Sequence, residues 1–468
     1  MIGITNIYPY LPHYRLKVES INKAWNRSPG KGERAIANYD EDGITMSVNT
    51  ISSMKKSWDD INFLIHATTS SPFIEESSSD LISYVLGINN NSINLNINQS
   101  LTSGTTALHV GFNLLKQYKK GLIITADRRD IQSGDEHEKV FGEGACAIEI
   151  GTENVLAKLE AFSSISDFGY DTWKLQDDVS VKKSDDKFAN EVKLENLAAV
   201  GRELLVKSNL QPSDIEWIVV ADSQSKLAKT IGNRLGFTPE QQFMSSVNNE
   251  VGYLGVSSGF FYLNELLLKA KNGERIMLLQ SGSGADGFIL SVTENVESFK
   301  RENGLLTQIS SKKVIENYNE ALVRRGLQKT VELKPYATKT YLRRERENNL
   351  RLRAQKCKEC GFIHFPKRPN CHHCQSREKM EWLWLERSGT IVTFTHDHVF
   401  PGSIEPKTMV VVDLDSGGRI FTQMTDHSPE QVKIGNRVTL SFRKFHEGGN
   451  FPNYYWKATP VLKGGDLI

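Results

Sequence analysis

Cysteine is scarce in this sequence: there are five in 468 residues, and four of them lie between positions 357 and 374. That distribution argues against a disulfide framework spread through the chain. An excess of charge of one sign is also lacking, because 57 lysines and arginines nearly balance 56 aspartates and glutamates. No global field attracts nucleic acid or an anionic membrane, so we expect neither as a partner.

Long apolar runs are missing as well. No uninterrupted stretch reaches the ~20 apolar residues that a membrane-spanning helix needs. The amino terminus, MIGITNIYPYLPHYRL, lacks the charged-then-apolar layout of a signal peptide. We therefore expect a cytoplasmic protein that does not associate with membranes.

The apolar content, 39% of the residues, is sufficient for roughly three domains with cores of their own. Up to about residue 295, β-branched runs alternate with amphipathic stretches, and this alternation predicts layered α/β packing. The predicted strands are INFLIHATT, GLIITAD, ACAIEI, EWIVVA, RIMLLQ and GFILSVT, and the predicted helices cover 76–86, 104–118, 193–208, 226–235 and 256–271. A polar stretch at 175–190 separates two such halves, and we expect it to be a surface excursion.

The last third of the chain has a different pattern. Residues 300–356 lose the strand signal and are rich in arginine and lysine, which predicts a solvated helical connector with a possible second role in holding phosphate groups. From 383 onward the pattern is all-β and predicts a small five-stranded barrel. Its strands are GTIVTFTHDHVF, TMVVVDLD, RIFTQMTD, RVTLSFRKF and NYYWKATPV.

The four clustered cysteines have the spacing of a zinc ribbon. Cys357 and Cys360 form one Cys-x2-Cys pair, and Cys371 and Cys374 form a second pair ten residues later. Two such knuckles can surround one tetrahedral Zn²⁺ with four thiolates, which closes the shell and favours a structural site over a catalytic one. A ribbon this small buries little apolar surface, so the metal supplies its folding energy. Other possible ligands, which we favour less, are His372, His373, His396 and His398.

Several segments between residues 1 and 295 resemble the 3-hydroxy-3-methylglutaryl-CoA synthase branch of the thiolase superfamily. They are ANYDEDGITMSVNT, SGTTALHVGFNLL, GEGACAIEIG, NRLGFTPEQ and SGSGADGF. From about 350 onward, KCKECGFIHFPKRPNC, VVVDLDSGGRIFTQMTD and VKIGNRVTLSFRKFHEGG are similar to the DUF35 family, whose zinc ribbon and OB-fold accompany thiolase-like proteins. The two resemblances together cover nearly the whole chain.

The resemblance implies a five-layered αβαβα body with a C-terminal zinc ribbon and an all-β OB-fold barrel. The expected boundaries are 1–165 and 166–298 for the two thiolase-like halves, 299–352 for the charged helical connector, 353–380 for the zinc ribbon and 381–468 for the OB-fold. It also implies a coenzyme A thioester as substrate, a pantetheine tunnel and a homodimer.

The residues of the family's acyl-cysteine chemistry are missing. Aligned on SGTTAL, the nucleophilic cysteine position falls on Leu101, which cannot attack a thioester. The family's histidine position falls near Ala221, and its glutamate position falls on Thr69. We therefore expect aldol or retro-aldol chemistry on a β-hydroxyacyl-CoA, which needs a general base and enolate-stabilising donors but no acyl-enzyme.

Loops that should face the site supply the candidate residues. For catalysis these are Tyr253, Asp222, Asn249 and Ser100, and for substrate binding they are Thr69, Ser71, Gly282 and Gly284. Each also has a structural interpretation: Tyr253 as a buried phenol, the Asn248–Asn249 pair as a turn, and Ser100 as a helix cap. We interpret His109 and Cys146 as core residues.

Two further hypotheses remain. The chain is alternatively a non-catalytic acyl-CoA-binding scaffold that docks onto a thiolase or hydratase. The last alternative is a synthase-like acyltransferase with a relocated nucleophile, which predicts a covalent acyl adduct on the protein.

Overall fold

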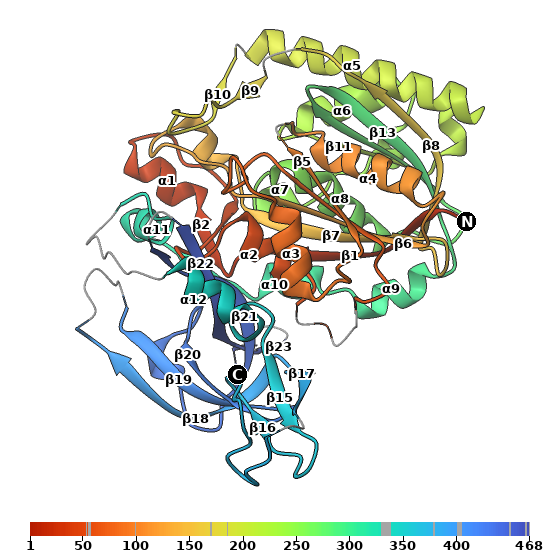
Figure 1. The fold of residues 1–468 in the computed structure, drawn as a ribbon. Coiled ribbons are helices and arrows are strands. Elements are labelled where there is room, and N and C mark those ends of the chain that lie inside the picture. Colours follow the sequence, from red (N-terminus) through yellow and green to blue (C-terminus); the bar gives the residue numbers. More distant parts are fainter. Residues whose placement is uncertain are drawn as a thin grey trace.

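The computed structural model describes residues 1–467 apart from residues 53, 55–57, 99, 169–170, 185, 329–337, 378–379, 400–404, 449–450 and 464–465. Figure 1 shows an α/β body below residue 300, a small ribbon, and an all-β domain that lies against the body. Within the described residues, no helix is both long enough and apolar enough to cross a membrane.

One nine-stranded sheet runs through the whole body in the order β11-β12-β13-β8-β1-β7-β6-β4-β5. Its two halves meet where β1 pairs with β8, through Gly3 opposite Lys158 and Ile4 opposite Ala157. The strands are β1 (Gly3–Tyr10), β4 (Phe63–Thr68), β5 (Ile93–Asn98), β6 (Lys120–Asp127), β7 (Gly144–Gly151), β8 (Ala157–Ile165), β11 (Trp217–Ala221), β12 (Arg275–Gly282) and β13 (Gly284–Val292).

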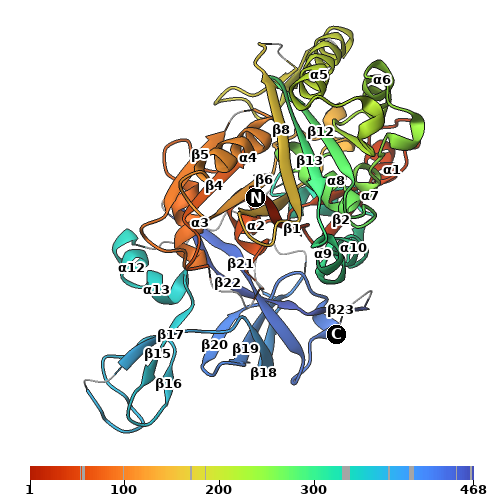
Figure 2. The same cartoon turned by 90° about the vertical axis from the view of Figure 1, so that its right-hand side faces the viewer.

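Helices cover the sheet on both outer faces and fill the space between its halves. Outside lie α2 (Gly43–Asn49) and α3 (Ser78–Leu86) against the first half, and α5 (Asp186–Ser208) and α6 (Ser225–Arg234) against the second. Between the halves lie α4 (Ser103–Leu114) and α8 (Ser258–Leu267), which contact strands of both. Figure 2 shows these layers from the side. The predicted α/β layering is confirmed, and its helices alternate with sheet as the thiolase resemblance implies.

Smaller elements complete the body. They are β2 (Tyr14–Lys17), α1 (Val18–Ala24), β3 (Glu33–Ile36), β9 (Thr172–Trp173), β10 (Lys182–Lys183), α7 (Val247–Glu250), and 3-10 helices at Glu136–Lys139, Pro212–Asp214, Pro239–Gln241 and Gly255–Ser257. The stretch at 175–190 is not purely a surface excursion. Strand β10 of this stretch pairs with β9, which precedes the stretch. Val181 is buried, and its N–H donates to the carbonyl of Asp130 at 3.1 Å, which holds the chain against the body.

The connector contains a strand as well as helices. It consists of α9 (Val296–Glu302), α10 (Leu305–Ser310), β14 (Lys313–Ile315), α11 (Tyr318–Arg324), α12 (Lys339–Arg344) and α13 (Arg346–Asn349). Strand β14 pairs with β2 in parallel, and its β-branched residues Val314 and Ile315 favour this conformation. The prediction of a helical connector did not include this strand. Residues 329–337 of the connector lie outside the described residues.

The ribbon and the OB-fold follow. The ribbon strands are β15 (Arg353–Cys357), β16 (Ile363–His364) and β17 (Met380–Trp384). The OB-fold has β18 (Ser388–Asp397), β19 (Lys407–Leu414), β20 (Arg419–Gln423), β21 (Arg437–Gly448) and β22 (Phe451–Pro460), with a 3-10 helix at Pro429–Gln431 and a small hairpin of β23 (Leu462–Lys463) and β24 (Asp466–Leu467) after it. All five predicted strands are present. The sheet order is β20-β19-β18-β21-β22, and a single bridge between Met424 and Ala458 links its two edges.

The OB-fold shares a core with the body. Buried side chains of α2 and α3, such as Val48 and Leu86, belong to the same apolar cluster as Phe442 and Trp456 of the OB-fold. Beside this cluster, Arg443 is 1% exposed and forms ion pairs with carboxylates of both domains. These pairs join it to Asp40 at 3.5 Å, to Glu41 at 2.7 Å and to Asp426 at 2.5 Å. The two domains are therefore packed as one unit.

Candidate active site and zinc ribbon

A cavity of about 640 Å³ lies between the body and the OB-fold. The body contributes Thr69, Ser71, Ser100, Leu101 and Gly282 to its walls, all of them named as site positions from the sequence. The hairpin of β21 and β22 contributes Lys444, Glu447 and Pro452, and the segment around β9 and β10 contributes Trp173, Lys174 and Val181. Five predicted positions are thus brought together, and the two outer walls are additions that the sequence did not indicate.

Leu101 lies in the turn that leads into α4 and lines this cavity. Its side chain is 9% exposed and packs in an apolar cluster with Ile131, Phe141, Val181 and Tyr253. At the position where the family resemblance implies a reactive cysteine, this chain therefore has a leucine side chain that packs against other apolar side chains.

The Ser100 hydroxyl oxygen accepts hydrogen bonds from two backbone N–H groups. It accepts from the N–H of Thr102 at 3.2 Å and from the N–H of Ser283 at 3.3 Å, and it lies 2.8 Å from the hydroxyl of Thr102. Gly282 permits this approach, since a Cβ there would lie 2.7 Å from the Thr102 nitrogen. Two converging amide donors form the kind of group that holds an oxyanion.

Thr69 and Ser71 line the opposite wall. The Thr69 hydroxyl and backbone N–H both donate to Asp127 Oδ1, at 3.0 and 2.7 Å, whereas the Ser71 hydroxyl donates to the carbonyl of Phe73 at 2.8 Å. Asp127 is fully buried, and burial raises its pKa, although the nearby Arg129 opposes the shift. This carboxylate orders the wall behind the cavity, and only its position at the end of the strand GLIITAD could have indicated it.

Tyr253 and Asp222 lie together around a second, smaller cavity of about 170 Å³. The Tyr253 hydroxyl accepts from Gln280 Nε2 at 3.1 Å, and burial, reinforced by the charge of Asp222, raises the pKa of this phenol. Asp222 accepts from the Ser281 hydroxyl at 2.8 Å and forms an ion pair with Lys193 at 3.2 Å. Burial alone would lower the pKa of Lys193, but Asp222 and Asp171 outweigh it, so that its pKa is raised.

The remaining predicted residues have structural surroundings. Asn249 is exposed on α7, whereas its neighbour Asn248 donates to the carbonyl of Asp222 at 3.2 Å. Gly284 adopts φ +92°, and a Cβ there would lie 1.8 Å from the carbonyl of Ile165. The His109 ring stacks on Phe162 at 3.7 Å, and Cys146 is fully buried, which raises the pKa of its thiol.

Arg129 is a cavity-lining residue that the sequence analysis did not single out. It is 5% exposed, and its guanidinium lies 4.0 Å above the ring of Phe141. Nη2 donates to the Thr172 hydroxyl at 3.2 Å, while Nε and Nη1 have no hydrogen-bond partner among the described residues. Burial lowers the pKa of this guanidinium, with Asp127 opposing the shift.

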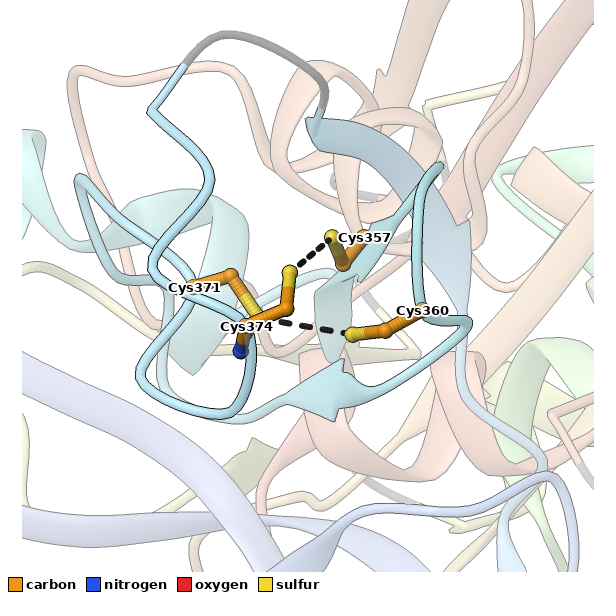
Figure 3. Close-up of side chains that lie close together, drawn as sticks. All are labelled: Cys357, Cys360, Cys371 and Cys374. Carbon is orange, nitrogen blue, oxygen red and sulfur yellow. Dashed lines mark hydrogen bonds between the residues drawn. The ribbon is translucent and has the colours of Figure 1, made fainter.

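The four ribbon cysteines converge as predicted. Their sulfurs all lie within 4.8 Å of one another, and Figure 3 shows them pointing to a common centre from the two knuckles. The distances Cys357 to Cys374 and Cys360 to Cys371 are both 3.6 Å. Tetrahedral Zn²⁺ with Zn–S bonds of about 2.3 Å separates its sulfurs by about 3.8 Å, so the four thiolates fit this metal. His364 Nε2 lies 3.3 Å from the Cys371 sulfur and can orient it from outside the shell.

Three family models match parts of the chain. The ChsH2 rubredoxin-like zinc ribbon domain matches residues 344–381, and the ChsH2 C-terminal OB-fold domain matches 382–443. The C-terminal domain of 3-oxoacyl-[acyl-carrier-protein] synthase III matches residues 205–290 of the body. The body is thiolase-like. The zinc ribbon and the OB-fold that follow it are the C-terminal modules that the sequence resemblance predicted.

Among curated proteins, the thiolase-like body is similar to archaeal hydroxymethylglutaryl-CoA synthases. The Picrophilus torridus enzyme is 25% identical over 322 residues, covering 65% of this chain and 91% of the relative. The Methanopyrus kandleri enzyme is 24% identical over 334 residues, covering 68% and 95%.

Solved structures give the same fold. An HMG-CoA synthase complexed with CoA has a TM-score of 0.66 at 18% identity, covering 72% of this chain and 95% of that chain. The HMG synthase of the curacin biosynthetic pathway, in complex with an acetyl donor acyl carrier protein, has a TM-score of 0.64 at 15% identity and covers 82% and 100%. At these identities the likeness carries the fold, and the chemistry has to be argued from the residues.

Proposed function

We propose that this protein makes or breaks a carbon–carbon bond beside the thioester of an acyl-CoA by an aldol-type route, without a cysteinyl intermediate. The observation that carries the proposal is Leu101, a hydrocarbon side chain lining the cavity at the family's nucleophile position. The similarity to proteins named as hydroxymethylglutaryl-CoA synthases supports the coenzyme A thioester as substrate.

The reaction balances without an acyl-enzyme. In the cleavage direction, a base takes the proton of the β-hydroxyl group as the bond between the α and β carbons breaks. The bonding electrons move to the thioester carbonyl, giving an enolate and a free ketone or aldehyde. Protonation of the enolate carbon then yields the shorter acyl-CoA, and addition is the reverse of these steps.

Residues of the two cavities support specific roles in this scheme. The amides of Thr102 and Ser283 that converge on Ser100 Oγ would hold the enolate oxygen once the serine hydroxyl turns aside. Tyr253 and Asp222 are the proposed proton-transfer pair, with the raised pKa of the phenol keeping it protonated so that it donates in the addition direction. The side-chain amide of Asn249 would orient a carbonyl, and Gly282 would admit the thioester, whereas Gly284 permits the close turn beside Ile165.

The test is turnover of a panel of β-hydroxyacyl- and β-ketoacyl-CoAs, with products followed by mass spectrometry. We expect cleavage of at least one β-hydroxyacyl-CoA by the full-length protein and a loss of about a hundredfold or more in Tyr253→Phe, the range for removing a general acid–base group. The exposed Tyr341, 47% accessible, provides the matched control Tyr341→Phe, which should keep full activity. Absence of product from every substrate would reject the aldol proposal.

One observation favours a second function, an acyl-CoA-binding scaffold that docks onto a thiolase or hydratase. Tyr253 and Asp222 line the smaller cavity, and Tyr253 packs behind Leu101 in the apolar cluster. A protein of this kind binds acyl-CoA and turns none over. A covalent acyl adduct on Ser100, detected by intact mass, would instead indicate the relocated-nucleophile alternative.

The homodimer and the cytoplasmic location remain proposals from the sequence. The dimer rests on the thiolase-like fold, and sedimentation of the purified full-length chain tests it directly.

A further inference from the structure

Arg129 combines deep burial with unused hydrogen-bonding capacity. The side chain is 5% exposed, and two of its three nitrogens have no acceptor among the described residues. A buried donor without a partner destabilises the fold, and more so when it carries charge. A buried donor that lacks an acceptor in the free protein can be explained by a ligand that supplies the acceptor when it binds.

The neighbouring arginine does not share this property. Arg128 lines the same cavity, but its two Nη atoms donate to the carbonyls of Glu41 at 2.8 Å and Arg325 at 2.7 Å. Its role in holding the loop is thereby accounted for. Of these two arginines, Arg129 is therefore the one that has hydrogen-bond donors without an acceptor among the described residues.

The acidic groups near Arg129 are already engaged elsewhere. Asp127 accepts from the backbone N–H groups of Thr69 and Val256 and from hydroxyls on the cavity wall. Asp171 forms an ion pair with Lys193 at 2.8 Å, and Lys193 is shared with Asp222. These carboxylates keep the guanidinium charged from a distance, but in the described part of the chain neither Asp127 nor Asp171 bonds to it.

The position of Arg129 indicates which part of a ligand it would meet. Its guanidinium rests on Phe141, which belongs to the same apolar cluster as Leu101, the side chain at the reaction position. Two lysines of this cavity are more accessible and paired on its rim: the Lys174 side chain is 33% exposed and bonded to Asp130, and the Lys444 side chain is 18% exposed and bonded to Glu447. Accessible lysines of this kind suit the phosphates of coenzyme A, whereas the buried Arg129 is on the side of the reaction position.

We infer that Arg129 is the receptor for a carboxylate on the acyl group, so that the protein selects acyl-CoAs whose chain ends in a negative charge. This inference rests on the proposed acyl-CoA substrate and specifies its class. A carboxylate matches the planar donor pair of a guanidinium, and the resulting hydrogen bonds are strong because they are charge-assisted. A methyl-ended chain would leave the same donors unpaired.

The test is direct binding, measured by isothermal titration of the full-length protein with pairs of acyl-CoAs of equal carbon number. The pairs are malonyl with propionyl, glutaryl with valeryl, and adipyl with hexanoyl, so that chain reach and charge are separated. We expect at least one carboxylated member to bind about tenfold to a hundredfold more tightly than its methyl-ended partner. In Arg129→Met that ratio should fall to about one, with unchanged affinity for the methyl-ended member.

Two further variants keep the test decisive. Lys174→Met removes another positive charge from the same cavity and should leave the ratio as in the wild type. Arg129→Lys keeps a charge but loses the planar fork, and should retain only part of the preference. The wild-type ratios stand by themselves if an Arg129 variant fails to fold.

Each result has one meaning. Wild-type binding of both members of every pair with equal affinity overturns the inference and leaves the acyl-CoA proposal intact. Equal weakening of both members by Arg129→Met also overturns it, since the arginine would then act on coenzyme A or on the fold. Binding of no acyl-CoA at all rejects the substrate class and the inference together, whereas selective binding without turnover rejects only the aldol chemistry.

Discussion

Asn49 of α2 and Phe442 of β21 exchange two hydrogen bonds across the boundary between the body and the OB-fold. Asn49 Nδ2 donates to the Phe442 carbonyl at 3.0 Å, and the Phe442 N–H donates to Asn49 Oδ1 at 2.8 Å. The Asn49 side chain thus pairs with the backbone N–H and C=O of Phe442 in the way that a neighbouring strand would. Both residues are buried, so the bonds join the domains where water does not compete.

Asn49→Leu should lower the free energy of unfolding by about 2–4 kcal/mol, because it leaves a buried backbone N–H and C=O unpaired. Urea unfolding followed by tryptophan fluorescence measures this loss, and Trp456 in the shared core reports on the OB-fold. Asn91→Ala, at an exposed turn position, is the control and should change the free energy by less than about 0.5 kcal/mol. Equal stability of Asn49→Leu and the wild type would contradict a bonded interface.

Zinc should be bound in one equivalent per chain and lost in Cys357→Ser, because removing one thiolate opens the tetrahedral shell. Metal content by plasma mass spectrometry and proteolysis of the ribbon between β15 and β17 measure both consequences. Cys146→Ala removes a cysteine from the core of the body and should keep the metal. Retention of one equivalent by Cys357→Ser would mean that another residue completes the shell.

Leu101→Cys should form a mixed disulfide when the protein meets oxidised coenzyme A, releasing one coenzyme A thiol. The reason is that position 101 lines the cavity proposed to hold the pantetheine arm. Intact mass measures the adduct, and the preference for oxidised coenzyme A over cystine measures guidance by the cavity. The wild type should not react at Cys146, whose buried thiol has a raised pKa.

Leu306→Cys is the matched control for that experiment, since Leu306 is 62% exposed on α10. It should react with both disulfides and show no preference. If Leu101→Cys behaves in the same way as Leu306→Cys, the cavity does not bind coenzyme A.

His66 should make the protein less stable as the pH falls from about 6.5 to about 4. Burial lowers the pKa of His66 to about 4, and its ring lies between the hydroxyls of Ser47 and Ser78 at 3.1 and 2.8 Å. Between these pH values the histidine is protonated in the unfolded chain, where its pKa is about 6.5, but stays neutral in the native protein. Acidification therefore favours the unfolded state. The loss is up to about 3 kcal/mol at the acid end.

The measurement compares melting temperatures at pH 7 and pH 5 for the wild type and His66→Gln. The variant should lose less on acidification, because its side chain does not titrate. His398→Gln, at an exposed site, should follow the wild type. An identical acid response of His66→Gln and the wild type would mean that His66 contributes no pH dependence.

The sequence predicted those parts of the fold whose pattern is local. Runs such as GLIITAD and EWIVVA became β6 and β11 because β-branched residues fill both faces of a buried sheet. Strand β1 was not predicted because Asn6 and Pro9 interrupt its apolar pattern, and β8 was not predicted because only two of its nine residues are buried. Turn glycines and cysteine spacing are equally local signals, and they located the ribbon.

The site was predictable only in part, for a physical reason. Thr69, Ser100 and Gly282 follow family motifs, and they do meet in one cavity. Arg129 and Lys444 meet there through pairings that span hundreds of residues, such as the bond from the Lys444 N–H to the carbonyl of Asp40 at 2.8 Å. Nothing local to DRRD or FRKF distinguishes such residues from solvated charge.

The hairpin wall of the cavity has a consequence for how the protein behaves on dilution. Lys444, Glu447 and Pro452 belong to the same polypeptide as the body they cover, so this wall is present in every molecule. A site assembled from separate subunits empties as their concentration drops below the dissociation constant. In this protein the hairpin wall and the body are parts of one chain and cannot separate on dilution. The contribution of this wall to ligand affinity should therefore be the same at nanomolar and micromolar protein concentration.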